Sequence, residues 1–161
     1  MEKIITVGLG EYAVSQDPDE ILVAYGLGSC VGIGMYDQRI NLAGLLHALL
    51  PIHPMGSADQ QSRYVDTGIK LLMDEMARKG ADRSRLIVRM AGGANMLVAP
   101  GFTGSFNIGT RNIEAAYSTL YSLKMSIAGK EVGGTTGRTV KFYVKDGRMT
   151  IRSIGNQERE V

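Results

Sequence analysis

The sequence has a single cysteine, no tryptophan and no apolar run long enough to cross a membrane. One cysteine cannot form an internal disulfide, so the value of Cys30 lies in packing or in reactivity. The amino-terminal residues also lack the long apolar segment and the small-residue cleavage site of a secretory signal. Together these absences predict a cytoplasmic protein without membrane insertion, in which Cys30 stays reduced.

An excess of one charge is also missing. The chain has 18 Lys and Arg against 16 Asp and Glu, spread along its length, and a formal net charge of +2. No basic patch stands out that would neutralise phosphate groups. We therefore expect no nucleic acid among its partners.

Motifs for metals and nucleotides are absent as well. One cysteine and two histidines do not make a tetrahedral zinc set without distant carboxylates, so we expect no metal. Gly8-Leu9-Gly10 and Gly26-Leu27-Gly28 resemble the start of a nucleotide loop, but neither continues to the third glycine at the right place. We therefore expect no cofactor.

What the sequence does contain is a nearly ordinary globular composition with many glycines. Its 161 residues are 44% hydrophobic and 21% charged, and 21 of them are glycine. This length is typical of one compact domain, which we place over residues 1–161.

Apolar periodicity predicts two amphipathic helices, over residues 63–79 and 111–123, among several short strands. A two-residue type I′ turn at Asp146-Gly147 is expected to join the last two strands. A glycine-rich loop at 129–137 and a frayed end at 157–161 complete the pattern. The result is an α+β fold of mixed or antiparallel strands, in layered sheets covered by two main helices.

Cys30 lies in a glycine-rich stretch, residues 26–34. Strand alternation after the glycine turn places Cys30, Gly32 and Gly34 on one face. Because the two glycines have no side chains, we expect them to line a groove through which another chain approaches the thiol. The turn Gly28-Ser29 can aim successive backbone N–H groups at a point where an oxyanion forms.

A predicted hairpin brings one of the two histidines close to this thiol. If strand pairing is centred within the turn at residues 37–41, Gly32 faces His47. Cys30 is then a diagonal neighbour of His47 on the same face, about 7–8 Å away. An imidazole there can take the thiol proton. His53, in the loop beyond the strand, has no such relation, so we favour His47.

Each of these residues also has a purely structural interpretation. Most free cysteines are small buried hydrophobes, and a histidine on an apolar strand is more often a satisfied core or surface residue than a base. The loop Gly92-Gly93-Ala94-Asn95 is most simply a plain turn, although its amides or the Asn95 side chain could line a substrate groove. A reversibly oxidised redox thiol is a weaker interpretation of Cys30.

Several separated motifs resemble the chemoreceptor glutamine deamidase family, CheD, in the family's order and along most of the chain. A set of ordered motifs is far more specific than any one of them. The matching segments are Gly26-Leu27-Gly28-Ser29-Cys30-Val31, His47-Ala48-Leu49-Leu50-Pro51, Arg63-Tyr64-Val65-Asp66, Ala91-Gly92-Gly93-Ala94-Asn95-Met96, Ile108-Gly109-Thr110-Arg111-Asn112, and Gly133-Gly134 followed by Gly137-Arg138.

The resemblance implies a protein-glutamine deamidase that converts chemoreceptor glutamines to glutamate and ammonia. It implies a fold similar to the catalytic domains of glutamine-deamidating toxins, with Cys30 as nucleophile and His47 as base. These are the two residues that the hairpin pairs independently. The implied partners are the cytoplasmic domain of a chemoreceptor, as substrate, and a CheC-type phosphatase.

This sequence departs from the family at one catalytic position. Members can carry a threonine six residues before the cysteine, and here that residue is Ala24. A backbone carbonyl from Ala24-Tyr25, or the side chain of Ser29, would then have to orient His47. The alternative is a non-catalytic regulatory module that binds a receptor or a phosphatase.

Overall fold

The computed structural model describes residues 1–96 and 107–161, which form two five-stranded sheets and two α-helices. The α+β class predicted from the sequence is confirmed. In chain order the elements are β1 (Lys3–Thr6), β2 (Tyr12–Ser15), β3 (Glu20–Leu27), β4 (Val31–Asp37), β5 (Leu42–Ala48), a 3₁₀ turn (Gln61–Arg63), α1 (Val65–Arg78), a second 3₁₀ turn (Arg83–Arg85), β6 (Ile87–Gly92), α2 (Ile108–Ser122), β7 (Ile127–Val132), β8 (Arg138–Tyr143), β9 (Met149–Ser153) and β10 (Arg159–Glu160).

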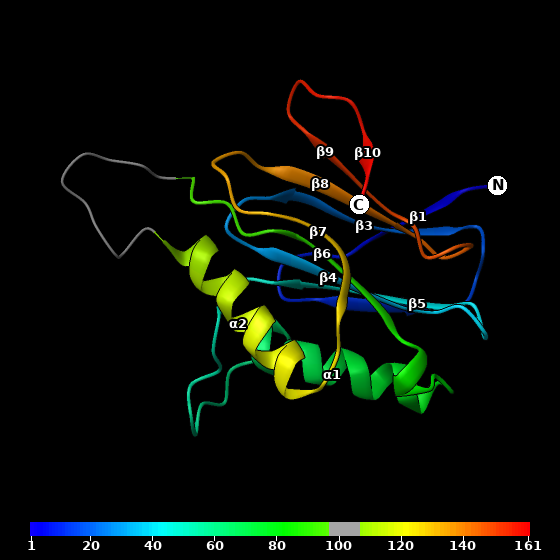
Figure 1. Ribbon diagram of the computed structural model, residues 1–161, viewed down its shortest axis with the longest axis horizontal. Helices are drawn as coiled ribbons and strands as arrows, with labels where there is room; N and C mark the ends of the chain where they lie inside the picture. Colours follow the sequence, from blue (N-terminus) through cyan, green and yellow to red (C-terminus); the bar gives the residue numbers. More distant parts are fainter. Residues whose placement is uncertain (97–106) are drawn as a thin grey trace.

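The molecule has three layers, in which two sheets lie face to face and both helices cover the outer face of one sheet (Figure 1). The helix-covered sheet has the order β2-β5-β4-β6-β7, and the other has the order β1-β3-β8-β9-β10. Both sheets are mixed, because β1 runs parallel to β3 and β6 parallel to β7 while the other pairs are antiparallel.

Alternation along the strands divides the core into two parts. Val31, Ile33 and Met35 of β4 face the helices and belong to the same buried cluster as the apolar stripe of α1. The next residue of the strand, Tyr36, packs between the sheets with Phe142. Neither α1 nor α2 is both long and apolar enough to cross a membrane.

The β4–β5 hairpin has the register expected from the sequence. Gly32 lies opposite His47, and Asp37 lies opposite Leu42 at the turn end. The hairpin is central in its sheet, because β6 pairs with the other edge of β4. Every residue of both strands is buried, so this register determines which side chains face the opposite sheet.

Three local predictions are wrong. β8 and β9 pair Phe142 with Met149, so their connection is longer than a two-residue turn, and Asp146 does not have a positive φ. Residues 129–132 extend β7 instead of belonging to a loop. The chain end does not fray, since Arg159–Glu160 pairs with β9 as the edge strand β10.

A buried carboxylate holds the turn of the hairpin. Asp37 is 0% exposed and accepts two hydrogen bonds from the Arg85 guanidinium, at 3.1 and 2.8 Å. It also accepts from the backbone N–H groups of Arg39 and Asp82, at 3.1 and 3.0 Å. Burial alone would raise the pKa of Asp37, but these donors outweigh it and keep the pKa below its ordinary value.

We expect Asp37→Ala to lower the free energy of unfolding by about 2 kcal/mol or more, because it leaves buried donors and a guanidinium without their acceptor. The loss should shrink as the pH falls through the lowered pKa of Asp37, where the wild-type carboxylate itself becomes protonated. Urea denaturation across pH measures both effects. Asp74→Ala, on the exposed side of α1, is the matched control and should change stability by about 0.5 kcal/mol or less. Equal losses in the two variants would contradict this role.

Candidate active site

His47 projects from β5 on the face that also carries Ala43 and Leu45, toward the opposite sheet, and is 3% exposed. Its Nδ1 lies 3.0 Å from the carbonyl oxygen of Val7. A carbonyl can only accept, so Nδ1 carries the proton and Nε2 keeps a free lone pair. Nε2 is buried and has no hydrogen-bond partner among the described residues. The ring is therefore held in the tautomer that a general base needs.

The segment Val7–Glu11, which connects the two sheets, surrounds His47 with backbone contacts. The N–H of Gly10 donates to the His47 carbonyl, and the N–H of His47 donates to the Glu11 carbonyl, at 2.8 and 3.0 Å. The Glu11 carboxylate accepts from the N–H of Gly8 at 2.7 Å and so closes the turn. No motif in the sequence marks this segment as part of the site.

Burial lowers the pKa of His47 below its ordinary value. The hydrogen bond to the Val7 carbonyl and the negative charge of Glu11 oppose this effect without reversing it. Because the pKa lies below about 6.5, the imidazole is neutral at pH 7.

Cys30 is half-buried immediately before β4, at the end of a turn whose carbonyl groups are all hydrogen-bonded. The carbonyls of Gly28, Ser29 and Cys30 accept, respectively, from the N–H of Ala94 at 2.9 Å, from the side-chain amide of Asn112 at 2.8 Å, and from the N–H of Gly93 at 2.8 Å. This turn is therefore fixed from two sides, by the loop after β6 and by α2.

Fixing these carbonyls also determines where the neighbouring N–H groups point. In a trans peptide the C=O of one residue points away from the N–H of the next. The bonds to the carbonyls of Gly28 and Ser29 thus turn the N–H groups of Ser29 and Cys30 in the opposite direction. Within residues 1–96 and 107–161, neither N–H donates to another residue's backbone carbonyl. Adjacent free donors of this kind can stabilise an oxyanion.

Burial raises the pKa of the Cys30 thiol, and the residue's own backbone N–H opposes this only in part. The thiol is therefore neutral at pH 7, like the imidazole of His47. The resting side chains are a thiol and a free base, not a thiolate paired with an imidazolium.

Cys30 and His47 share one face of the hairpin, as the register predicted. Cys30 packs against the buried cluster between the sheets, and His47 follows Leu45 of that cluster by two residues along β5. In the described part of the chain, no hydrogen bond joins the Cys30 Sγ to the imidazole. Catalytic hydrogen bonds are often long in free enzymes and tighten when substrate binds.

Gly32 and Gly34 do not line an open groove, which corrects the expectation for this face. Both are buried within β4. A Cβ at Gly34 would lie 2.9 Å from side-chain atoms of Phe142 and Met149, and one at Gly32 would lie 3.2 Å from Leu27. Their missing side chains make room for the opposite sheet to pack closely.

Gly92, Gly93 and Asn95 place the end of β6 and the loop after it against the Cys30 turn and the start of α2. Gly92 and Gly93 have φ of 106° and 71°, and a Cβ at Gly92 would collide with the Cys30 carbonyl, so both positions favour glycine. The Asn95 amide donates to the Thr110 hydroxyl at 2.8 Å and accepts from the Thr110 N–H at 3.3 Å. These contacts hold the start of α2 against the loop, and they engage the Asn95 side chain that the sequence predicts as a possible lining of a substrate groove.

The group that orients His47 differs from both expected candidates. It is a backbone carbonyl, but that of Val7 and not one from Ala24-Tyr25, and in the described part of the chain the Ser29 side chain makes no hydrogen bond to the ring. Ala24 is itself fully buried between the sheets. No local sequence pattern links Val7 to His47, because the two residues are 40 positions apart.

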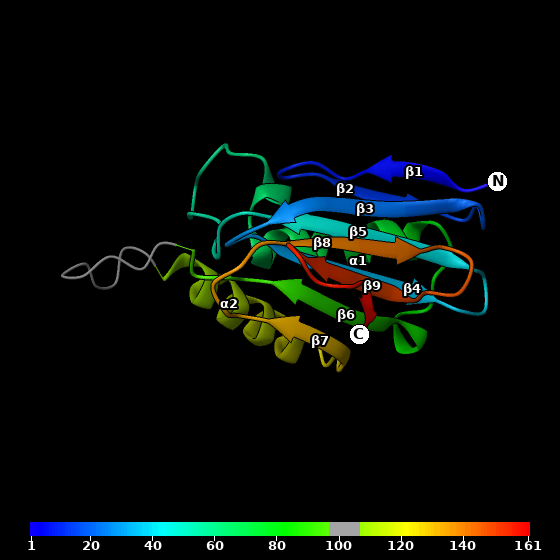
Figure 2. The ribbon, with the colours of Figure 1, turned by 90° about the horizontal axis from the view of Figure 1, so that it is seen from above.

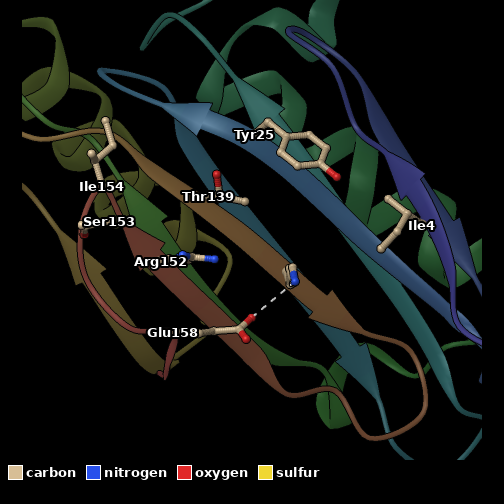
Figure 3. Close-up of a pocket in the computed structure, with 9 residues that line it drawn as sticks. Ile4, Tyr25, Thr139, Arg152, Ser153, Ile154 and Glu158 are labelled. Atoms are coloured by element: carbon tan, nitrogen blue, oxygen red, sulfur yellow. Dashed lines mark ion pairs between the residues drawn. The ribbon is translucent and has the colours of Figure 1, made fainter.

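A surface depression lies away from these residues, on the outer face of the β1-β3-β8-β9-β10 sheet (Figure 3). It encloses about 590 Å³ and is lined by side chains such as Ile4, Tyr25 and Arg152, with the Lys141–Glu158 ion pair across it at 3.8 Å. Its lining includes neither Cys30 nor His47. Among the described residues, no three His, Cys, Asp or Glu side chains gather to hold a metal ion.

His53 lies in the loop that follows β5. Its Nε2 is 3.0 Å from the Asp59 carbonyl, and its ring packs edge-on against Tyr64. These contacts organise the loop that follows β5. Figure 2 shows this loop at the same end of the molecule as the start of α2.

Comparisons with known proteins agree with the resemblance seen in the motifs. The family model for CheD, described as chemotactic sensory transduction, matches residues 49–153. The chain is 38% identical to a probable chemoreceptor glutamine deamidase CheD of Symbiobacterium thermophilum, over 99% of this chain and 98% of that protein. It is 40% identical to the protein of the same name from Caldanaerobacter subterraneus, over 96% of this chain and 95% of that protein.

The similarity also reaches the segment that holds Cys30 and His47. The chemoreceptor glutamine deamidase CheD of Thermotoga maritima is 35% identical over 99% of this chain and 96% of its own. The family model begins only at residue 49, so these nearly full-length relatives extend the likeness to the catalytic candidates.

The neutral state of both side chains predicts how Cys30 reacts with iodoacetamide. The alkylation rate should rise with pH through a midpoint above about 8.5, because burial raises the thiol pKa. His47→Gln should leave that midpoint unchanged. A rate plateau near pH 6 that disappears in His47→Gln would instead show a preformed ion pair. Cys30 is the only cysteine, so mass spectrometry reports on this site alone.

Proposed function

The chain belongs to the CheD family, and we propose that it deamidates glutamine side chains of chemoreceptors with Cys30 as nucleophile and His47 as general base. One observation carries this proposal: a half-buried thiol and a buried histidine whose Nε2 is unpartnered share one face of the β4–β5 hairpin, and the thiol follows a turn whose N–H groups, among the described residues, donate to no other residue's backbone carbonyl. The relatives named as chemoreceptor glutamine deamidases support the substrate class.

In the first half-reaction, His47 Nε2 takes the proton of the Cys30 thiol as the sulfur attacks the amide carbon of the glutamine. The carbonyl oxygen gains the negative charge, which the N–H groups of Ser29 and Cys30 stabilise. The C–N bond then breaks, and His47 returns the proton to the departing nitrogen. Ammonia leaves, and a thioester joins Cys30 to the substrate.

In the second half-reaction, His47 removes a proton from water as the water oxygen attacks the thioester carbon. The same N–H groups stabilise the second oxyanion. When the C–S bond breaks, the proton passes from His47 to the sulfur, which restores the thiol. The products are a glutamate side chain and the free enzyme.

The neutral pair explains how this chemistry starts. A thiol of raised pKa is a weak nucleophile until a base removes its proton, and a buried neutral imidazole is that base. Because the two groups are not hydrogen-bonded in the resting protein, substrate binding brings the sulfur within reach of Nε2. The thiol therefore reacts only slowly with small electrophiles at pH 7 and is activated when the substrate is attacked.

Two exposed apolar side chains flank the site and suit a protein substrate. Leu9 is 65% exposed and lies in the segment that surrounds His47. Met96 is 52% exposed, and its sulfur lies 3.3 Å from where a Cβ on Gly28 would be. We propose that a receptor segment, or a CheC-type phosphatase, docks over this pair. A receptor's cytoplasmic domain as substrate implies that the protein acts in the cytoplasm.

The second candidate is a non-catalytic module, and the observation that favours it is Ala24 in place of the family's threonine. The Val7 carbonyl weakens that case, because it supplies the acceptor that the threonine would have provided. The two candidates differ in whether the protein converts glutamine at all.

Incubation with receptor cytoplasmic fragments, followed by mass spectrometry of glutamine-to-glutamate conversion, tests the enzyme directly. We expect Cys30→Ala to abolish conversion, and His47→Gln to lower kcat by about 10²–10⁴, the usual contribution of a general base. His53→Gln is the matched control and should stay within about threefold of wild type. Absence of conversion by the wild type, or equal conversion by Cys30→Ala, would falsify the enzyme proposal.

Substitution of the flanking apolar pair tests how the substrate docks. We expect Leu9→Glu and Met96→Glu to raise KM for a receptor fragment about fivefold or more, because each places a charge in an apolar contact, with kcat within about twofold. Tyr121→Glu is the control, since Tyr121 is 86% exposed near the far end of α2. A fall in kcat with unchanged KM would show that these side chains act on the chemistry instead.

A further inference from the structure

Asn112 connects the two segments that carry the catalytic candidates. It lies in the second turn of α2 and is 0% exposed. Its side-chain Nδ2 donates to the carbonyls of Ser29 and Leu49, both at 2.8 Å. Ser29 immediately precedes Cys30, and Leu49 follows His47 by two residues. One amide group therefore holds both sides of the site.

The chemistry of this contact requires an amide. An apolar side chain would leave two buried carbonyls without donors, and a carboxylate would repel both oxygens. The Asn112 Oδ1 is buried without a partner among the described residues, which is unfavourable. The two donors of the amide, and not its acceptor, thus account for asparagine at this position.

The bond to Ser29 has a direct consequence for the nucleophile. It fixes the plane of the Ser29–Cys30 peptide, and so it fixes the direction of the Cys30 N–H. That N–H is a proposed oxyanion donor, and it also lies against the sulfur of its own residue. A different peptide orientation would remove both interactions.

Asn112 is itself held firmly in place. Asn95 makes two hydrogen bonds with Thr110 in the first turn of α2. Gly109 packs so closely on the carbonyls of Gly93 and Ala94 that a Cβ there would collide with them. The start of α2 therefore cannot shift relative to the loop that also holds the Cys30 turn.

We propose that Asn112 is a positioning residue for the deamidation: it aims the Cys30 N–H at the oxyanion and keeps the Cys30 turn aligned with the strand that carries His47. This inference rests on the proposed function and adds a residue to its machinery. Asn112 acts through the backbone and does not touch the reacting atoms.

Steady-state kinetics on a receptor fragment test the role. We expect Asn112→Ala and the isosteric Asn112→Asp to lower kcat at least about tenfold, since loss of an oxyanion donor costs about 10²–10³ and misalignment costs part of that. KM should stay within about threefold, because the substrate surface is unchanged. Thr119→Ala, a buried change two turns along the same helix, should stay within about threefold in kcat.

Alkylation of Cys30 gives a second readout that needs no substrate. The midpoint of the iodoacetamide pH profile should move upward in Asn112→Ala, because the thiolate loses its own N–H, and should not move in Thr119→Ala. If the wild type fails to deamidate but the midpoint shifts, the proposed function is wrong, and only the orientation of the Cys30 N–H by Asn112 is retained. A wild type that deamidates, with folded Asn112 variants of unchanged kcat and midpoint, overturns the positioning role.

The wild-type protein offers a test that does not depend on whether variants fold. The side-chain amide protons of Asn112 should exchange with D₂O far more slowly than those of Asn95. Both Asn112 protons are buried and hydrogen-bonded, whereas Asn95 is partly exposed. Slow exchange supports the contact. Exchange at the rate of an exposed amide would show that the contact is not maintained and would overturn the proposal.

Discussion

The hydrogen bond from His47 Nδ1 to the Val7 carbonyl depends on both sheets at once. Val7 is held by β3 of one sheet, because its N–H donates to Val23 at 2.8 Å, whereas His47 belongs to β5 of the other. The Val7 carbonyl can fix the Nδ1–H tautomer only when the sheets are packed and the Val7–Glu11 segment crosses between them. The orientation of the imidazole is therefore set by the same packing that forms the fold.

The glycines around Cys30 serve the same packed arrangement. Gly34 accommodates Phe142 from the opposite sheet, and Gly92 lets the loop after β6 reach the Cys30 carbonyl. With its carbonyls bound on the inside, the turn can present N–H groups on the outside. Activity and packing thus make compatible demands on this stretch, since both require small residues beside the thiol.

The parts of the site that the sequence predicts are those set by local periodicity. The pairing of Gly32 with His47 follows from the strand pattern and the short turn between the strands, so the shared face of Cys30 and His47 could be inferred. Strand alternation predicts which residues share a face, but it does not predict which part of the protein packs on that face. The groove expected at Gly34 is filled by Phe142 of the opposite sheet. The prediction of a two-residue β8–β9 turn was wrong for a related reason. Asp-Gly favours such a turn locally, but the register of the surrounding sheet overrides this preference.

Contacts between distant segments could not be predicted in the same way. Val7 lies 40 residues from His47, and Asn112 lies 83 residues from Ser29. Both contacts use backbone carbonyls, which every residue possesses, so the carbonyl partner has no distinctive residue type. Asn112 does stand in a motif of the family resemblance, but a motif marks a position without saying which atom it serves.

A backbone acceptor also changes what Ala24 means for catalysis. A threonine hydroxyl can be lost by a single substitution, whereas the Val7 carbonyl remains whatever side chain stands at that position. Once the carbonyl fixes the Nδ1 proton, a hydroxyl at residue 24 is not needed for the tautomer, and the methyl group there packs between the sheets instead. A neutral carbonyl stabilises an imidazolium less than a charged partner does, so it opposes only in part the burial that lowers the pKa of His47. Burial likewise raises the pKa of the Cys30 thiol, so in the proposed reaction the N–H donors positioned by Asn112 would have to stabilise the negative charge that develops during attack.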